Sequence, residues 1–292
     1  MENFDPTKSS PVPQSLELAP KEVQKESVLK GEGNKQRNVE RSINVYSDAH
    51  SGEEYINKGN FREVEHFVSL LSKGILNVSD VVEKEGEYFS RKMPLENVEA
   101  GTEADFEAEM FLLNFLFADW DHQYANDEGM NMLAKQRAAK SGHGDNVLHY
   151  QNVIKNDEGQ FVHYDYGKAF GSDQDQEADI FKKSKTNDPF LGLLTRAHLL
   201  YKFKPSLDTK NLTISRKNSN GVSYADFKAS VAEKVNAFDD ALKDEGFFSK
   251  VVEKSKIDLN RIQFSFLKKD GEEGLREYLL HRVEVLKDIV NP

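Results

Sequence analysis

The sequence predicts an α+β fold, with a small strand-rich N-terminal unit followed by a mostly helical remainder. Short segments of strand-like composition flank one helical segment between residues 27 and 94. From residue 95 onward, long segments carry apolar residues every three to four positions, which is typical of one buried helix face. Because 38% of the 292 residues are hydrophobic, the chain can bury a substantial core.

The N-terminal unit is expected to follow a disordered tail. Residues 1–26 are polar and rich in proline, and we interpret them as that tail. Three strands are then predicted, in SVLKGEGNKQ, RSINVYSDAH and EEYINKG, with a Ser-Gly turn between the last two. The segment FREVEHFVSLLSKG has helical spacing and should end at Gly74. A further strand, GEYFSRKMP, should end at Pro94 and complete a unit over residues 27–94.

The remainder, residues 95–292, should begin with the strongly apolar helix DFEAEMFLLNFLFA. A polar stretch over 127–145 is interpreted as a helical insert. The segment NVIKNDEGQFVHYDYG predicts a hairpin that turns at Asp-Glu-Gly. Three further helices are expected, in PFLGLLTRAHLLYKF, YADFKASVAEKVNAFDDALK and EEGLREYLLHRVEVLKDIV.

Composition excludes several classes of function. The formal net charge of -11 argues against general nucleic-acid binding, which needs a basic surface. The absence of cysteine excludes disulfides, thiolate zinc sites and thiol nucleophiles. No apolar run approaches the ~20 residues of a membrane-spanning helix, and the N-terminus lacks the apolar core of a signal peptide. The expected location is the cytoplasm, or a host cytosol after secretion without a cleaved signal peptide.

Two acidic loops carry the chemistry. Residues 114–126 read NFLFADWDHQYAN, so acidic residues follow a helix end that ordinarily favours Lys, Arg or Gly. Residues 161–170 read FVHYDYGKAF and deliver Asp165 from the predicted hairpin. Phosphoryl transfer needs such a set: one carboxylate orients the attacking hydroxyl, while a second carboxylate and an amide oxygen hold magnesium. Gly167 is expected to let the backbone turn sharply after Asp165.

These two stretches resemble a kinase superfamily. DWDHQYAN is similar to the D-R-H-x-x-N loop of phosphatidylinositol 3- and 4-kinases, HipA-type toxin kinases and Golgi secretory-pathway kinases, and FVHYDYGKAF resembles their hydrophobic-D-x-G-x-x-F motif. The resemblance implies a two-lobed protein-kinase-like fold that binds ATP with Mg²⁺ or Mn²⁺. It implies Asp121 as catalytic base and Asn126 and Asp165 as metal ligands. The chain departs from the pattern at His122, where these families have arginine, and in the polar insert.

The N-terminal unit offers the other parts of a kinase site. A kinase needs a strand lysine for the phosphates and a helix glutamate that holds this lysine. Lys58 ends a predicted strand, and the next helix carries Glu63 and Glu65. We favour Glu63, because it flanks the apolar face of that helix. Gly31 and Gly33 form a candidate phosphate-covering loop.

A second loop competes for the catalytic role. His143-Gly144-Asp145 resembles the H-G-D loop of aminoglycoside and choline phosphotransferases, and Asn152 resembles the metal-binding asparagine of ordinary kinases. In those families Asp and Asn are five positions apart, whereas Asp145 and Asn152 are seven apart. A hybrid site, with Asp121 as base and Asn152 as metal ligand, is a further alternative.

A basic cluster follows the D-x-G segment. Lys182, Lys183 and Lys185 lie where kinases carry an activation loop. The simple interpretation is that these lysines balance local acidic residues. The alternative is a site for an inositol polyphosphate or an anionic lipid headgroup, in which lysines bind phosphate.

The sequence therefore favours a divergent kinase that transfers the γ-phosphate of ATP to a protein hydroxyl. A lipid or small-molecule kinase of the same fold is one alternative. A pseudokinase, a folded interaction module without turnover, is the other, because catalytic-type residues on a fold do not establish activity. The composition fits a bacterial effector kinase acting in a host cell and fits many cytosolic proteins as well.

Overall fold

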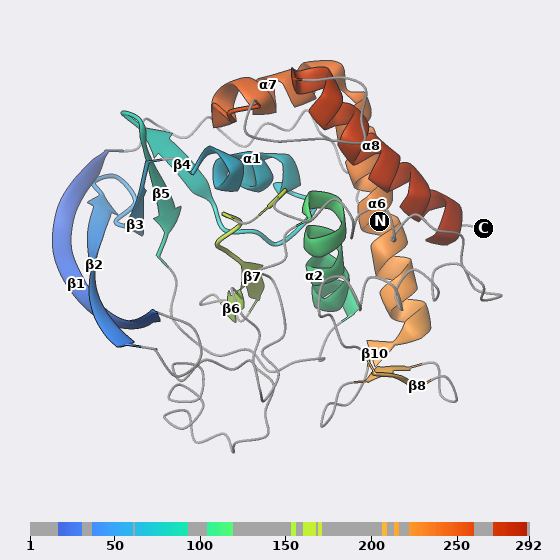
Figure 1. Cartoon of the computed structure of the whole chain (residues 1–292), viewed down its shortest axis with the longest axis horizontal. Helices are drawn as coiled ribbons and strands as arrows, with labels where there is room; N and C mark the ends of the chain where they lie inside the picture. Colours follow the sequence, from blue (N-terminus) through green and yellow to red (C-terminus); the bar gives the residue numbers. More distant parts are fainter. Residues whose placement is uncertain are drawn as a thin grey trace.

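The structure of this chain is a computed structural model. It describes residues 17–30, 37–60, 62–92, 104–118, 153–155, 160–167, 169–170, 206–208, 213–215, 222–259 and 271–290. Within these residues the protein has an α+β fold, with an antiparallel sheet in the N-terminal part and helices in the C-terminal part (Figure 1). This confirms the fold class that the sequence predicts.

The N-terminal sheet has five antiparallel strands in the order β1-β2-β3-β5-β4. Their bounds are β1 (Leu18–Lys30), β2 (Arg37–Asp48), β3 (Glu54–Gly59), β4 (Val81–Lys84) and β5 (Glu87–Arg91). Helix α1 (Glu63–Ser72) connects β3 to β4 and is followed by Gly74 in the left-handed conformation, with φ 81°. The strand and helix predictions for residues 37–91 are confirmed, except that β4 was not predicted.

Strand β1 corrects the predicted N-terminal tail. Residues 18–26 belong to this strand, which pairs with β2 from Leu18↔Asp48 to Lys30↔Arg37. The polar composition misled the prediction because β1 is an edge strand, and the side chains described in it, those of residues 18–24, are largely exposed; even Val23 is 64% exposed. Polar composition alone therefore does not separate an exposed edge strand from a disordered tail.

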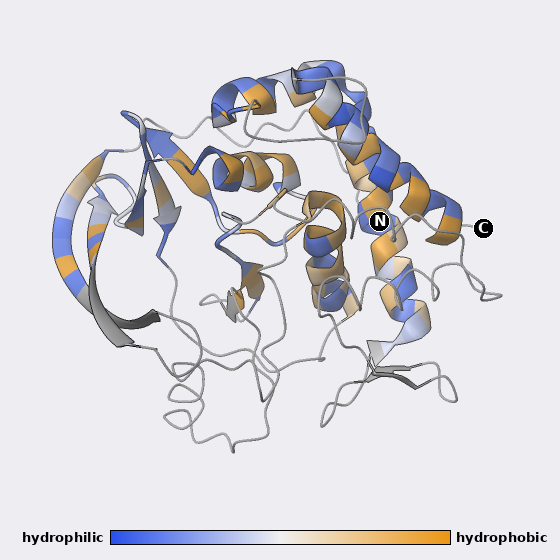
Figure 2. Ribbon diagram, viewed as in Figure 1, coloured by the Kyte–Doolittle hydropathy of each residue, from blue (hydrophilic) through white to orange (hydrophobic). Residues whose placement is uncertain are grey.

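The helical part begins with α2 (Ala104–Phe117), which is buried at every residue from Phe106 onward and coloured largely hydrophobic in Figure 2. Three further helices complete it: α6 (Tyr224–Lys243), α7 (Glu245–Ser255) and α8 (Gly271–Val290). A small sheet comprises β8 (Ser206–Asp208), β9 (Thr213–Ser215) and β10 (Val222–Ser223). Helices α2, α6 and α8 confirm the prediction, while α7 and the small sheet were not predicted. The helices predicted for 127–145 and 189–203 lie outside the described residues.

Helix α8 supplies the cation that the C-terminal end of α2 lacks in its own sequence. The guanidinium of Arg282 is fully buried and donates a hydrogen bond to the carbonyl of Phe115. Its Cζ lies 4.5 Å from the ring centroid of Tyr278 and 5.3 Å from that of Phe115. A cation on the last carbonyls complements the helix dipole. The C-terminal end of α2 therefore takes its cation from α8.

A short hairpin connects the N-terminal unit to the helical part. It consists of β6 (Val153–Lys155) and β7 (Phe161–His163), as predicted. The N–H of His163 donates to the carbonyl of Asn77 and the N–H of Ser79 donates to the carbonyl of His163, both at 2.8 Å. Residues 77–79 join α1 to β4, so β7 pairs directly with the N-terminal unit.

Candidate functional site

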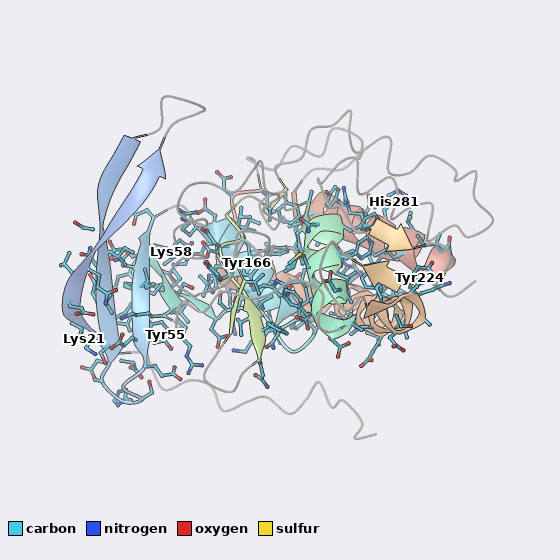
Figure 3. All side chains as sticks on the ribbon, turned by 90° about the horizontal axis from the view of Figure 1, so that it is seen from below. Lys21, Tyr55, Lys58, Tyr166, Tyr224 and His281 are labelled. Carbon is cyan, nitrogen blue, oxygen red and sulfur yellow. The ribbon has the colours of Figure 1, made fainter. Side chains whose placement is uncertain are left out.

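Lys58 connects two carboxylates that come from different parts of the chain. It lies on β3 with a side chain that is 13% exposed. Its Nζ is 3.4 Å from Oε1 of Glu65 on α1 and 3.4 Å from Oδ1 of Asp165 after β7. In Figure 3, Lys58 lies on the side of the sheet nearer to Tyr166, the residue after Asp165. A strand lysine, a helix glutamate and the D-x-G aspartate are therefore brought together.

The helix glutamate of this pair is Glu65, which corrects the preference for Glu63. Glu65 is fully buried, and it shares a helix face with Val68, Ser69 and Ser72, which are buried as well. Burial raises the pKa of the Glu65 carboxyl, and the nearby Lys58 ammonium opposes this rise. The spacing of residues 65, 68, 69 and 72 places them on one helix face. This face was not predicted to be buried, because two of its four residues are serines.

Asp165 adopts a conformation that few residue types tolerate. Its φ is 63°, in the left-handed region, where Asp is enriched among non-glycine residues. The adjacent Tyr166 anchors the backbone at Asp165. The Tyr166 hydroxyl donates to the carbonyl of His163 and accepts from the N–H of Ser79 at 3.3 Å. Both partners belong to the connection between hairpin and N-terminal unit. Asp165, 38% exposed at its side chain, is thus held in place while its carboxylate stays accessible.

Gly167 serves a different purpose from the predicted one. The left-handed backbone lies at Asp165, whereas Gly167 itself is outside the left-handed region. A Cβ added at Gly167 would lie 2.5 Å from Nη1 of Arg62. The glycine therefore makes room for a guanidinium.

Arg62 was not predicted as a site residue from the sequence. This residue immediately precedes α1, and its Nη1 lies 4.0 Å from Oδ1 of Asp165, the same oxygen that Lys58 approaches. Its position, four residues after Lys58 and three before Glu65, was the only signal in the sequence. The site thus contains two cations and two carboxylates.

The chain leading to Asp121 leaves α2 beside the D-x-G segment. The N–H of Phe170 donates to the carbonyl of Phe117 at 2.5 Å, and Ala118 follows with φ 49°. Phe117 is the last residue of α2, and Phe170 is the last residue of the D-x-G-x-x-F motif. This contact brings the C-terminal end of α2 next to the segment that carries Asp165.

The other predicted site residues lie outside the described residues. They are Gly31, Gly33, Asp121, Asn126, Asp145, Asn152, Lys182, Lys183 and Lys185. Among the described residues, no group of three or more His, Asp or Glu side chains could hold a metal ion.

No protein-family model matches the chain, and a search of curated proteins finds no match. Within the parts of the chain that the structure describes, no helix is long and apolar enough to cross a membrane.

Proposed function

We propose that this protein is an ATP-dependent phosphotransferase, a divergent kinase. The observation that carries the proposal is the convergence of Glu65 and Asp165 on Lys58, at 3.4 Å each. Protein kinases place a lysine on the third strand, pair it with a glutamate of the following helix, and hold metal with a D-x-G aspartate. Here the lysine is on β3 of a five-stranded sheet, the glutamate is on the next helix, and Asp165 opens D-x-G.

The donor chemistry of Asp165 fits a hard divalent cation. Mg²⁺ and Mn²⁺ favour carboxylate oxygens, and the Asp165 carboxylate is fixed by its backbone yet accessible. Such an ion, when bound, would compensate the charge of the ATP phosphates. Lys58, held in place by Glu65, would bind phosphate oxygens directly.

The catalytic base and the second metal ligand are proposed among residues outside the described part of the chain. Asp121 is proposed to orient the attacking hydroxyl, which is supported by the contact between Phe117 and Phe170. For the second metal ligand, the hairpin register favours Asn152 over Asn126. Val153, the residue after Asn152, pairs with His163, two residues before Asp165.

A protein hydroxyl is the proposed acceptor. The described helices α6, α7 and α8 carry more Asp and Glu than Lys and Arg residues, and Asp239 of α6 forms ion pairs with both Lys243 and Lys287. This arrangement supports a protein acceptor over an anionic membrane surface, which favours a basic face. The basic cluster at residues 182–185 keeps its alternative role as a polyphosphate site.

Binding of ATP tests the site. Calorimetric titration with ATP and Mn²⁺ should show metal-dependent binding by the wild-type protein. Lys58→Ala and Asp165→Ala should each weaken this binding at least about 10-fold, since each removes a charged partner of the phosphates or the metal. The matched controls are Lys73→Ala and Asp80→Ala, which break an exposed ion pair of 2.8 Å elsewhere in the N-terminal unit. The proposal would be contradicted if the controls lost ATP binding, or if the site variants bound ATP as tightly as the wild type.

Transfer of labelled phosphate to casein or to the protein itself separates a kinase from a pseudokinase. Asp121→Ala should lower transfer at least ~100-fold, as for a residue that orients the nucleophile, while Asp145→Ala should change it less than ~5-fold. The opposite ranking would assign catalysis to the H-G-D loop. Binding without transfer in the wild type would identify a pseudokinase.

A further inference from the structure

Arg62 contributes the second cation at Asp165, and the resemblance to kinases assigns it no role. Its Nη1 and the Nζ of Lys58 approach the same carboxylate oxygen, at 4.0 and 3.4 Å. The two cations differ in their surroundings: the Lys58 side chain is 13% exposed, and that of Arg62 is 33% exposed. Lys58 also has buried Glu65 as a partner, which fixes it. Arg62 is thus the outer and more accessible cation.

The contact between Arg62 and Asp165 leaves the guanidinium with donors to spare. A separation of 4.0 Å is an ion pair without a hydrogen bond, because N–H···O bonds need about 3.2 Å or less. A guanidinium carries five N–H donors in a planar fork that matches the oxygens of a phosphate. The Arg62 side chain does not cap α1 either, so these donors are not used by the helix end.

The chain makes specific room for this side chain. The ideal Cβ position at Gly167 lies 2.5 Å from Nη1 of Arg62, which is closer than a real Cβ contact allows. A glycine at the third position of D-x-G therefore lets the guanidinium lie directly against the backbone next to Asp165. Arg62 is an integral part of the site and not a neighbouring surface residue.

We propose that Arg62 is a phosphate-binding residue of the nucleotide site. The inference rests on the proposed function, since it requires that a metal-bound nucleoside triphosphate is held at Asp165. Phosphate oxygens that approach this carboxylate through a shared divalent ion come within reach of both cations. Lys58 binds them from the buried side and Arg62 from the solvent side, with its fork of donors.

The test is calorimetric titration of the folded full-length protein with ATP and Mn²⁺. Arg62→Gln should weaken binding of the metal-nucleotide at least about 10-fold, because it removes a charge-assisted hydrogen-bond donor from a phosphate. Binding of Mn²⁺ alone should not become tighter. The matched control is Arg91→Gln on β5, which removes an exposed arginine that pairs with Glu53 at 2.7 Å. This control should bind ATP like the wild type.

Gly167→Ala supplies an independent variant that keeps the arginine. The added Cβ should displace the guanidinium, which is the end of a flexible side chain, and so weaken ATP binding by a similar factor. The double variant should be no weaker than Arg62→Gln alone, because both changes remove the same contact. Gly246→Ala on α7, where the nearest atom to an added Cβ is at 3.4 Å, is the glycine control.

The outcomes separate the two proposals. If the wild type does not bind ATP with Mn²⁺, the proposed kinase function itself is wrong. If the wild type binds and Arg62→Gln binds equally well, the function stands and the role of Arg62 is overturned. If Arg62→Gln binds Mn²⁺ or ATP more tightly, Arg62 competes with the metal for Asp165, which likewise overturns its role as a phosphate ligand.

Discussion

Lys58 shows how one side chain can organise a site from three separate elements. Its ammonium lies at equal distance from a buried carboxylate and from an accessible one. Burying Glu65 is unfavourable by itself, since removal from water disfavours the charged form and raises its pKa. A buried carboxylate that is retained at such a position, with a lysine as its partner, is more consistent with placing the lysine than with stabilising the fold.

Exchanging the two candidate glutamates tests this assignment. Glu65→Gln should lower ATP affinity or phosphate transfer at least about 10-fold, because Lys58 loses the partner that holds it towards the phosphates. Glu63→Gln, two positions earlier on the same helix, should change either quantity less than about 3-fold by the same reasoning. Titration with ATP and Mn²⁺ on both folded variants provides the measurement. A larger loss of ATP affinity in Glu63→Gln than in Glu65→Gln would restore Glu63 as the favoured partner of Lys58.

The sequence was informative about residues whose type and order follow a chemical rule. Lys58 and Asp165 were predicted because a kinase needs a strand lysine for phosphate and a D-x-G aspartate for metal, and the structure brings these two side chains to 3.4 Å. The choice of Glu65 over Glu63 depended on which helix face turns towards β3, and two serines concealed that face. Arg62 could not be found, because its contact with Asp165 spans about a hundred residues of sequence and depends on the space at Gly167.

Helix α1 carries both the buried Glu65 and a buried histidine. His66 is 7% exposed, and burial lowers its pKa to about 4, with nearby Glu83 opposing this shift and Lys256 adding to it. Its Nδ1 has no hydrogen-bond partner among the described residues, and its ring meets Tyr88 edge-on at 5.7 Å. The folded protein therefore favours neutral His66, and protonation of this side chain opposes the packing of α1 on the sheet.

Stability should consequently depend on pH through His66. Its pKa is about 4 in the folded state and the ordinary value of a histidine is 6.5, so the unfolded chain binds more protons between these values. The free energy of unfolding should rise with pH across this window. The rise due to His66 should total about 3 kcal/mol, because the cost of protonating this buried side chain is present near pH 4 and disappears above pH 6.5. Urea denaturation of the wild type and of His66→Gln at several pH values across this window measures it. The variant should show a shallower pH dependence; equal slopes would contradict the prediction.

Elements with a strong apolar period were predicted more accurately than those without one. Helix α6 spans Tyr224–Lys243 as predicted, because its apolar residues recur along one face and Ser223 caps its start. Residues 18–26 of strand β1 were missed because they pair with β2 through the backbone and the described side chains, those of residues 18–24, are largely exposed. Helix α7 was missed because it buries few residues, namely Phe248, Val251 and Ser255.

At the scale of the molecule, the site lies where the sheet, the hairpin and the helices meet. Phe170, five residues after Asp165, contacts Phe67 of α1, Phe117 of α2 and Tyr278 of α8, with ring centroids 6.0 to 6.1 Å apart. Phe67 in turn meets Phe248 of α7 edge-on. The D-x-G segment is therefore packed into the main core, and the position of Asp165 depends on how helices from both ends of the chain pack together.

This packing predicts that one aromatic residue links stability to ligand binding. Phe170→Ala removes three ring contacts and leaves a cavity between α1, α2 and α8. Large-to-small changes at buried phenylalanines cost about 3–5 kcal/mol, and Phe170 is partly exposed, so we expect a loss of about 2–4 kcal/mol in the free energy of unfolding. Because Asp165 lies on the same short segment, the folded variant should also bind ATP with Mn²⁺ at least about 10-fold more weakly, since the proposed metal ligand would be held less firmly.

Phe247→Ala is the matched control, since Phe247 lies on α7 and is 37% exposed. Its cost should stay below about 1 kcal/mol, as for most surface substitutions. Urea denaturation gives the stability of both variants, and calorimetric titration under conditions where each is fully folded gives their affinities. A Phe170→Ala protein that loses stability but binds ATP like the wild type would show that Asp165 is held by the hydrogen bonds of Tyr166 alone. The ring contacts of Phe170 would then stabilise the fold without positioning Asp165, the proposed metal ligand.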